Sequence, residues 1–384
     1  MDFALSEEDA MIAETAQRMA RERLAPLAET LDRGEGRDAF LGNLKRLAEH
    51  GFMGLNVRAD YGGSEAGTTA FAVSIEAFAR ACASTAVTAS VTNMVGEIIQ
   101  AVGSEEQRRR YLPPLCDGTY AAGAFCLTEA GAGSDPAGMT TRAAMDGNEW
   151  VLNGAKLYIS SAPYAGVFVV WAVTDPDAKK GKGISCFLVE AGTPGLIVGK
   201  TEKKLGQAGS ATCEVSFEDC RLPADALMGR QNDGFRVAVS ELAGGRIGVA
   251  SLALGIARAA MDAGIAYARE RRQFDRAIAD MQGIQWMIAD RETELEAARL
   301  LILQAAWLKD QGRPFARAAS MAKLYASEAA QRATYTALQI HGGAGYLTDH
   351  PVERHARDAR ITTIYEGTSE IQRLIIARDV LANA

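Results

Sequence analysis

The sequence predicts an α+β protein in which a helical unit, a β unit and a second helical unit follow one another. Apolar residues recur at helical spacing up to about residue 117, turn-separated β-branched runs fill the middle, and stronger helical periodicity returns after Gly234. At 384 residues the chain is longer than one hydrophobic core usually serves. We therefore expect three domains: an all-helical N-terminal domain over 1–119, a middle β domain over 120–232 and a C-terminal helical bundle over 233–384.

The N-terminal third is rich in Ala, Leu, Glu and Arg and predicts several helices. Ser6, followed three residues later by Asp9, resembles a capped helix start, because a serine hydroxyl can accept a backbone N–H of the first turn. Pro113 and Pro114 are expected to end the helical region, since a proline removes a helical backbone donor.

The middle of the chain has the character of strands. Gly166–Val173 and Ser185–Val189 are runs of β-branched and aromatic residues. Asp146-Gly147-Asn148 lies between two such runs and has the residues of a hairpin turn. The segment therefore predicts a β domain.

Long helices are expected after Gly234. Two sets of apolar residues recur at intervals of 7, 4 or 3, which places each set on one helix face. The sets are Ile247, Leu254, Met261 and Ile265, and Ile288, Leu295, Ala298, Ile302 and Ala305. Helices of this length predict an antiparallel bundle.

Charge and composition argue against two classes of partner. Lys and Arg total 41 against 48 Asp and Glu, and the formal charge of -7 argues against nucleic-acid binding. No long apolar run suggests a bilayer crossing, so membrane insertion is not expected. The four histidines form no metal-binding spacing with the cysteines, so we also expect no metal site.

The cysteines and the N-terminus indicate a compartment. Six cysteines are scattered without a C-x-x-C pair, which favours reduced thiols over disulfides. The first residues lack a secretory signal and are too acidic for a transit peptide. We expect a bacterial cytoplasmic location, or the mitochondrial matrix if a leader has been removed.

Three glycine-containing segments are candidates for chemistry. In the first, Phe125–Asp135, a strand runs into a glycine-rich turn whose N–H groups can approach an anion or an electron-rich ring. It is neither a G-x-G-x-x-G fingerprint nor a Walker sequence, and a plain β-turn is the alternative. Within it, Glu129 and Asp135 are expected to hold the turn rather than to do chemistry.

The second and third segments lie in the C-terminal third. Gln339–Tyr346 interrupts helical sequence with three glycines in four positions, which requires close backbone approach or an unusual turn; a helix-connecting loop is the alternative. In Ile364–Arg373 a carboxylate, Glu366, stands between an aromatic residue and a glycine. Thr368 or Ser369 can simply cap the last helix, but this leaves the carboxylate unexplained.

Together, in this order and at these separations, the three segments resemble the acyl-CoA dehydrogenase family. The similarity runs nearly end to end and includes Tyr61-Gly62-Gly63 and the stretch from 204 to 219. The C-terminal third, including Met321-Ala322-Lys323-Leu324, is most similar to the short-chain members.

The resemblance implies a fold, an assembly and a reaction. The fold has an N-terminal helical domain, a central β domain and a C-terminal four-helix bundle, in a homotetramer with FAD between the β domain and the C-terminal helices. The reaction is the α,β-dehydrogenation of a short straight or branched acyl-CoA to the trans-2-enoyl-CoA. Electrons would pass to an electron-transferring flavoprotein.

The resemblance also assigns ligand contacts by position. Residues along the flavin would be Phe125, Leu127, Thr128, Gly133 and Ser134, with Tyr158, Ile159 and Ser160 covering its other parts. Residues that hold the pyrophosphate and adenosine would be Arg271, Gln273, Phe274 and Gln282, with Gln339, Ile340, Gly342 and Gly343 contributed by a neighbouring subunit. Thr368, Ser369 and Glu370 would meet the dinucleotide at a helix start. Implied substrate contacts are Ser134, Ala243, Arg246, Tyr365 and Gly367.

Glu366 matches the catalytic base of the family. Between substrate and flavin, its carboxylate would be desolvated and its pKa raised toward the operating pH. Its backbone N–H and a flavin ribityl hydroxyl would stabilise the charge on the thioester oxygen. Some relatives carry the base on the helix around Leu242–Arg246, but that position here is Gly245. Arg246 would orient the site, with a surface ion pair as the alternative.

Two departures and two rival functions stay open. Tyr158 stands where the family commonly has Trp, and Ala243 where Asp or Asn is usual, so one polar substrate contact is expected to be absent. The rivals are a flavoprotein of the same fold with altered chemistry, such as an oxidase, desulfinase or nitroalkane oxidase, and a non-catalytic acyl-CoA-binding assembly protein. The presence of Glu366 disfavours the desulfinase, and its presence beside the flavin positions disfavours the non-catalytic protein.

Overall fold

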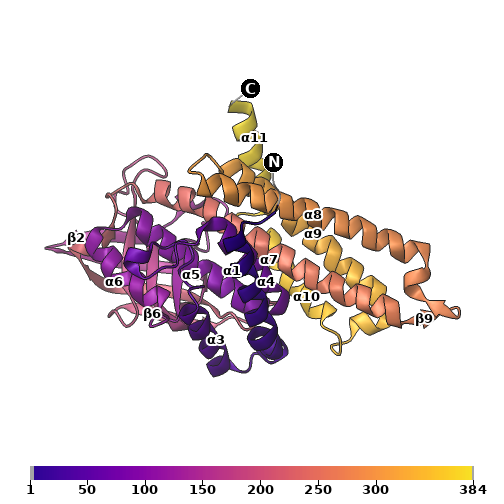
Figure 1. Cartoon of the computed structure of the whole chain (residues 1–384). Helices are drawn as coiled ribbons and strands as arrows, with labels where there is room; N and C mark the ends of the chain where they lie inside the picture. Colours follow the sequence, from indigo (N-terminus) through magenta and orange to yellow (C-terminus); the bar gives the residue numbers. More distant parts are fainter. Residues whose placement is uncertain (1–3, 383–384) are drawn as a thin grey trace.

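In the computed structural model, which describes residues 4–382, N-terminal helices lie between a β sheet at one end of the molecule and a long C-terminal bundle at the other (Figure 1). The N-terminal helices are α1 (Glu7–Met19), α2 (Ala28–Asp32), α3 (Arg37–Glu49), α4 (Gly67–Ala81), α5 (Ala83–Val102) and α6 (Glu105–Cys116). The strands are β1 (Ala122–Cys126), β2 (Arg142–Asp146), β3 (Glu149–Ser160), β4 (Ala165–Val173), β5 (Ile184–Glu190), β6 (Leu196–Thr201), β7 (Thr212–Pro223) and β8 (Leu227–Met228). The C-terminal elements are α7 (Gly234–Glu270), β9 (Arg272–Gln273), β10 (Arg276–Ala277), α8 (Gln282–Asp310), α9 (Ala316–His341), α10 (Val352–Arg360) and α11 (Ser369–Ala382).

A helix start and the end of the N-terminal helical region follow the sequence signals. The Ser6 hydroxyl accepts the Asp9 N–H at 3.0 Å, as its spacing predicts. Helix α6 has Pro113 and Pro114 in its last turn and ends two residues later at Cys116, close to the predicted end of the helical region. The prolines remove donors, but their carbonyls still accept hydrogen bonds, from Asp117 at 2.9 Å and from Tyr120 at 2.7 Å, so the last turn keeps its acceptors occupied.

The sheet is ordered β6-β7-β3-β2-β4-β5-β8, with β1 paired parallel to β4. Strands β2 and β3 form the predicted hairpin, in which Asp146 pairs with Glu149 across a two-residue turn. Strand β4 is buried on both faces. Its Val167, Val169 and Trp171 join the core shared with the helices, whereas the alternate residues join a second core within the β domain. The sheet therefore has one face available to the helical layers.

Helix α7 is the central element of the C-terminal bundle. Most of its predicted apolar face is buried against neighbouring helices, and only Ile265 near its end is partly exposed. It contains an 18-residue window apolar enough to cross a membrane, which corrects the expectation of no such run. Because 67% of that window is buried inside the protein, the window has the character of a core helix.

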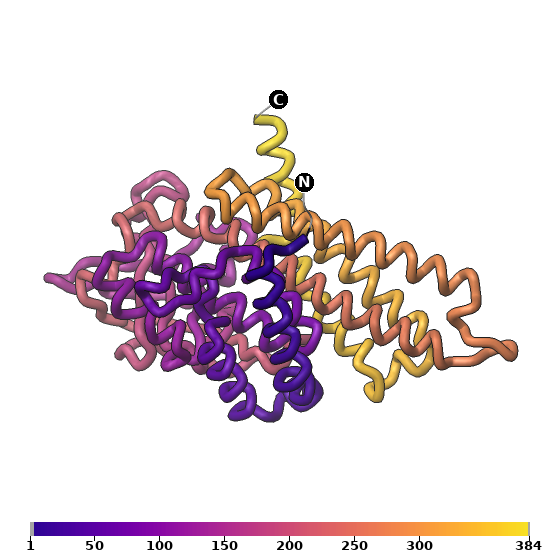
Figure 2. The backbone as a smooth tube through the Cα atoms, in the orientation of Figure 1, coloured from indigo at the N-terminus to yellow at the C-terminus, as the bar shows by residue number. Residues whose placement is uncertain are grey.

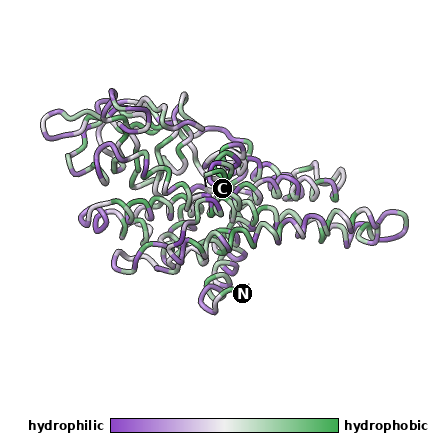
Figure 3. The backbone as a smooth tube through the Cα atoms, turned by 90° about the horizontal axis from the view of Figure 1, so that it is seen from above, coloured by the Kyte–Doolittle hydropathy of each residue, from purple (hydrophilic) through white to green (hydrophobic). Residues whose placement is uncertain are grey.

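The bundle has an extended end. Helices α7, α8 and α9 run together beyond the other domains to the β9–β10 hairpin, and α11 projects away from them (Figures 1 and 2). Hydrophobic residues follow the inner helices, while the tip of the long arm is hydrophilic (Figure 3). Thus one part of the bundle contacts the other domains and the distal part does not.

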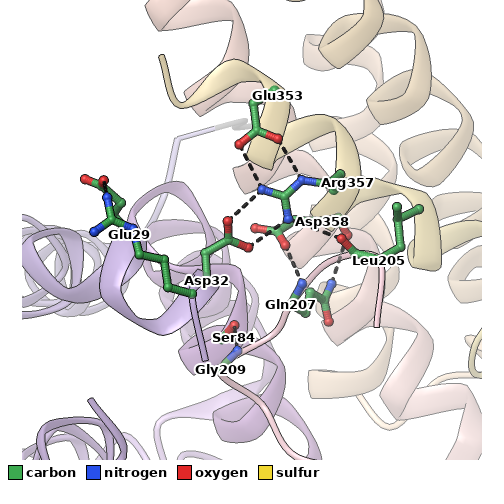
Figure 4. A network of polar contacts seen from close by, with 10 residues as sticks. Glu29, Asp32, Ser84, Leu205, Gln207, Gly209, Glu353, Arg357 and Asp358 are labelled. Atoms are coloured by element: carbon green, nitrogen blue, oxygen red, sulfur yellow. Dashed lines mark hydrogen bonds and ion pairs between the residues drawn. The ribbon is translucent and has the colours of Figure 1, made fainter. Parts of the chain in front are cut away.

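A polar junction joins all three domains (Figure 4). Arg357 on α10 donates two hydrogen bonds to Asp32 at the end of α2, at 2.8 and 2.6 Å. The same guanidinium binds Glu353 at 2.7 and 2.9 Å and the Leu205 carbonyl, in the loop after β6, at 3.2 Å. A planar guanidinium suits such paired contacts, so one side chain fixes the three domains relative to each other.

Candidate active site

The candidate base lies in a strained turn before α11. Glu366 has φ 53° and Gly367 has φ 94°, so a non-glycine residue adopts the left-handed region. Such a conformation costs about 1–3 kcal/mol and persists only where the surroundings impose it. Gln372 donates to the carbonyls of Glu366 at 3.2 Å and Gly367 at 3.0 Å, and Lys323 donates to the Gly367 carbonyl at 2.7 Å. These contacts hold the turn in place.

The Glu366 carboxyl packs closely against α7 and α5. Its Oε2 is buried and has no hydrogen-bond partner among the described residues. A Cβ added to Gly245 of α7 would lie 3.0 Å from the Glu366 carboxyl carbon and 2.7 Å from the Met94 sulfur of α5. The absence of a side chain at Gly245 therefore makes room for the carboxyl, at the position where some relatives carry their base.

Burial raises the pKa of Glu366 to about 7, and two cations, Lys323 and Arg246, oppose this rise. A carboxyl with this pKa can both accept and return a proton near neutral pH. Arg246 is itself buried, with 6% of its surface exposed, and its Nη1 lies 3.5 Å from Ser320 Oγ. The alternative that Arg246 forms a surface ion pair is therefore wrong.

Tyr365 connects this turn to the domain junction. Its hydroxyl accepts a hydrogen bond from Gln207 at 3.4 Å, and burial raises its pKa. Gln207 in turn donates through its side chain to the Asp358 carbonyl at 3.1 Å and through its backbone to the Asp358 carboxylate (Figure 4). A Cβ on the preceding Gly206 would lie 2.6 Å from the Asp358 nitrogen, so glycine permits this close approach.

The Phe125–Ser134 segment leaves β1 and turns over the sheet. Phe125 packs on Trp171 with ring centres 4.5 Å apart, and Leu127 is buried. Glu129 forms a buried ion pair with Lys156 at 2.8 Å and accepts N–H groups from Thr140 at 2.6 Å and Thr141 at 3.0 Å. These bonds hold the pKa of Glu129 down to about 2 despite burial, so Glu129 has the turn-holding role expected of it.

The rest of this region is open. Gly133 has no other atom within 4 Å of an added Cβ, and Ser134 is exposed. Tyr158, near the end of β3, has φ 61° and is 70% exposed. Ile159 points into the β-domain core and Ser160 is partly exposed, so a ligand here would meet the backbone rather than the side chain of Ile159.

Two further predicted segments meet at the distal end of the bundle. Ile340 packs in one cluster with Ile278, which brings Gln339–Gly343 beside the loop that carries Arg271, Gln273, Phe274 and Gln282. Phe274 is 86% exposed with φ 51°. The resemblance named a neighbouring subunit only for Gln339–Gly343, but the structure places both segments together on one chain.

This distal site is far from Glu366 within one chain. Gly245, beside the Glu366 carboxyl, and Glu270, before Arg271, are 25 residues apart on α7. At the rise of an α-helix this is about 38 Å. The two groups of predicted residues therefore cannot surround one small ligand within a single chain.

The remaining predicted residues lie around the Glu366 turn. Thr368 caps α11, with its hydroxyl 3.4 Å from the Ile371 nitrogen, whereas the buried Ser369 hydroxyl has no partner among the described residues. Glu370 is exposed. Ala243 is buried on α7. The structure thus brings Arg246, Tyr365 and Gly367 close to the carboxyl.

Sequence reasoning missed the two side chains that hold the turn. Lys323 lies fully buried among the alanines of α9, and a lysine on an apolar helix stripe is the signal that could have revealed it. Gln372 follows Ser369 by three residues, as in a capping box, but it binds carbonyls before the helix instead.

Models of known protein families match all three domains of the chain, in the same order. Models described as the N-terminal, middle and C-terminal domains of acyl-CoA dehydrogenase match residues 6–119, 124–220 and 232–381. The order of helical, β and helical domains expected from the sequence is thereby confirmed.

Individual relatives are similar over their full length. Acryloyl-CoA reductase (NADH) from Anaerotignum propionicum is 47% identical over 384 residues, covering 99% of this chain and 96% of that protein. The structure of butyryl-CoA dehydrogenase from Megasphaera elsdenii has a TM-score of 0.95 at 37% identity, covering 99% of this chain and 100% of that chain. A chain in a structure described as the electron transferring flavoprotein of Acidaminococcus fermentans has a TM-score of 0.96 at 41% identity, with 99% and 100% coverage.

Proposed function

Because this chain belongs to the acyl-CoA dehydrogenase family, we propose that it converts a short straight or branched acyl-CoA to the trans-2-enoyl-CoA, with Glu366 as the base. The protein is an oxidoreductase with short-chain acyl-CoA dehydrogenase-type activity, and FAD is the cofactor of its family. The observation that carries the assignment of the base is the unpartnered, buried carboxyl oxygen of Glu366, held beside Gly245 with a pKa of about 7.

The chain has surfaces that fit FAD. Added Cβ atoms at Gly131, Gly133, Gly342 and Gly343 would meet nothing within 4 Å, so these glycines leave open backbone that another group can approach. Two exposed aromatic rings, Tyr158 and Phe274, are also among the positions that the resemblance assigns to the cofactor. The residues that would hold the flavin and the dinucleotide are those assigned by the resemblance.

The distance between the two parts of the site supports an oligomer. A cofactor that meets Glu366 of one chain lies about 38 Å along α7 from the distal segment of that chain. We therefore assign Arg271–Gln282 together with Gln339–Gly343 to the cofactor of a neighbouring subunit in a homotetramer. Mixed oligomers of Glu366→Gln chains and Gly343→Glu chains should recover activity that neither variant has alone, whereas no recovery would refute the shared site.

The carboxylate and the backbone N–H of Glu366 account for the proton step. The Glu366 carboxylate takes the α-proton, and its free backbone N–H, which makes no hydrogen bond within residues 4–382, donates to the thioester oxygen where charge develops. The chemistry that bound FAD supplies is acceptance of the β-hydride. Met94 and the buried α7 face exclude water from the carboxyl, which keeps its pKa near neutrality.

The same arrangement suits the reverse reaction. A carboxyl with a pKa of about 7 is partly protonated at neutral pH and can return a proton to the α-carbon of an enoyl thioester. The 47% identity to a protein named acryloyl-CoA reductase favours this direction as a second candidate. Turnover with butyryl-CoA and an artificial acceptor, compared with turnover of acryloyl-CoA and NADH, separates the two directions.

Electron-transferring flavoprotein is the partner that we propose for the dehydrogenase direction. The likeness to a chain in a structure described as an electron transferring flavoprotein supports this choice. We also propose a cytoplasmic location, because all six cysteines are free and buried, as suits a reducing compartment.

The decisive test of the base is Glu366→Gln. The change is nearly isosteric and keeps the backbone N–H, so folding, FAD content and butyryl-CoA binding should persist while anaerobic flavin bleaching slows by about 10² to 10⁴. Glu241→Gln is the matched control, because Glu241 is a carboxylate on α7 whose pKa burial also raises. Bleaching by Glu366→Gln within about tenfold of wild type would exclude Glu366 as the base.

A further inference from the structure

Two fully buried polar side chains clamp the backbone beside Glu366 from different helices. Lys323 of α9 and Gln372 of α11 both have 0% of their surface exposed. Both donate to the Gly367 carbonyl, at 2.7 and 3.0 Å. The turn that they hold is the one with φ 53° at Glu366 and 94° at Gly367. An unfavourable backbone conformation is therefore fixed from two sides.

The two clamping residues differ in charge. A neutral amide such as Gln372 would suffice to bind a carbonyl, whereas a buried ammonium carries a desolvation cost that only a nearby anion offsets. Burial lowers the pKa of Lys323 to about 8, and the Glu366 carboxylate is the largest influence that opposes the fall. The position of Lys323 is thus explained by Glu366 better than by the carbonyl alone.

The charged groups around Glu366 form a short list. Arg246 faces it from α7 and Lys323 from α9, while Glu328 on α9 and Glu370 on α11 act on Lys323. Glu97 on α5 and Lys309 on α8 pair with each other beside Gly244, and both act on the carboxyl of Glu241 on α7. Of the two cations that face Glu366, Lys323 has the larger effect on its ionisation.

We propose that Lys323 is a positioning residue of the reaction, which fixes the Glu366 turn through the Gly367 carbonyl and places a positive charge that favours the carboxylate form of Glu366. The inference rests on the proposed function, in which Glu366 takes the α-proton. In a purely structural role, the hydrogen bond from Lys323 would only stabilise the packing of α9 against the turn before α11, without an effect on the ionisation of Glu366.

The test compares variants that separate charge from hydrogen bonding. Lys323→Met removes both, Lys323→Arg keeps the charge, and Gln372→Met removes a neutral donor to the same carbonyl. Anaerobic flavin bleaching by saturating butyryl-CoA is followed from about pH 5 to pH 9 in single turnovers of the FAD-loaded protein. Flavin content and thermal midpoint are measured alongside as controls for folding.

The acidic limb of the pH profile is the range in which the bleaching rate falls as Glu366 becomes protonated. Loss of the cation at position 323 should shift this limb. Lys323→Met is expected to move that limb upward by about one pH unit, because an opposite charge at close range favours the ionised carboxyl. Lys323→Arg should leave the limb in place. Gln372→Met should lower the rate at every pH without moving the limb.

The outcomes distinguish this inference from the proposed function. If the limbs of Lys323→Met and Gln372→Met both coincide with that of wild type, the role of Lys323 is structural and the inference is wrong. If Lys323→Met fails to fold, Lys323→Gln, which keeps a donor without the charge, is measured in the same way and decides the question. Rapid bleaching by Glu366→Gln would instead overturn the proposed function, and the inference with it.

Discussion

Replacing Gly245 by alanine should displace the proposed base without altering its chemistry. The added methyl group would lie 3.0 Å from the Glu366 carboxyl carbon, 2.7 Å from the Met94 sulfur and closer still to Oε2. Ordinary contacts of a Cβ begin at 3.4 Å. Because Lys323 holds the Gly367 carbonyl and Gln372 holds the Glu366 carbonyl, the carboxyl rather than the turn must move.

The required displacement sets the size of the effect. Relief of these contacts needs a shift of about 1 Å, and a misplacement of that size in a reacting group can cost about 10²-fold in rate. We therefore expect Gly245→Ala to slow anaerobic flavin bleaching by butyryl-CoA about 10²-fold. FAD content should persist, and the helix should gain up to about 1 kcal/mol from the better helix former.

Gly244→Ala provides the matched control on the same helix. Its Cβ would meet the Lys309 ammonium at 3.0 Å and a Glu97 carboxylate oxygen at 3.4 Å, and both are ends of long side chains that can move away. The gain in helix propensity is the same, so only the displacement of Glu366 differs. Bleaching by Gly245→Ala within threefold of that by Gly244→Ala would show that the carboxyl at this place is not the base, or is not held there.

Three further predictions concern ionisation and stability. The bleaching rate should rise with pH through about 7, the pKa of Glu366, because only the ionised carboxyl accepts a proton; a flat profile in stopped-flow traces would contradict this. Burial raises the pKa of Asp358 to about 6, so the folded chain binds this proton more tightly than the unfolded chain and stability falls as pH rises through 6. Asp358→Asn, which mimics the protonated form, should therefore stabilise the protein by up to about 3 kcal/mol at about pH 8 and change little near pH 4 in urea unfolding. Lys156→Met leaves the Glu129 carboxylate buried without its cation and should destabilise by about 3–5 kcal/mol, and a loss below about 1 kcal/mol in the same assay would refute the role of this pair.

Helix caps and turns could be predicted from the sequence, because a few adjacent residues determine each of them. The cap at Ser6 and the hairpin after Asp146 depend on a few neighbouring residues, and both appear as predicted. The helical region ends close to Pro113 and Pro114, as predicted, and α6 continues two residues past them because the carbonyls of both prolines still accept hydrogen bonds. Burial of Leu112 and Leu115 also favours the longer helix.

The residues of the candidate site also differ in whether the sequence alone reveals them. Glu366 and its glycine are visible in the sequence because a carboxylate between Tyr365 and Gly367 has no role in capping a helix. Arg246 was expected near the site, but only the folded chain shows that it is buried rather than paired at the surface. Lys323 stands 43 positions before Glu366, and no local pattern links the two.

The sequence by itself determined the order of the domains, the place of the candidate base between Tyr365 and Gly367, and the glycine-rich segments, because each follows from the properties of adjacent residues. Only the tertiary structure decided which distant residues share a site. It placed Gly245 against the Glu366 carboxyl, set Lys323 and Gln372 on one carbonyl, and carried Arg271 about 38 Å away along α7. The physical reason is that packing and burial act between elements far apart in the chain, and they decide both the pKa of a carboxyl and the reach of a helix.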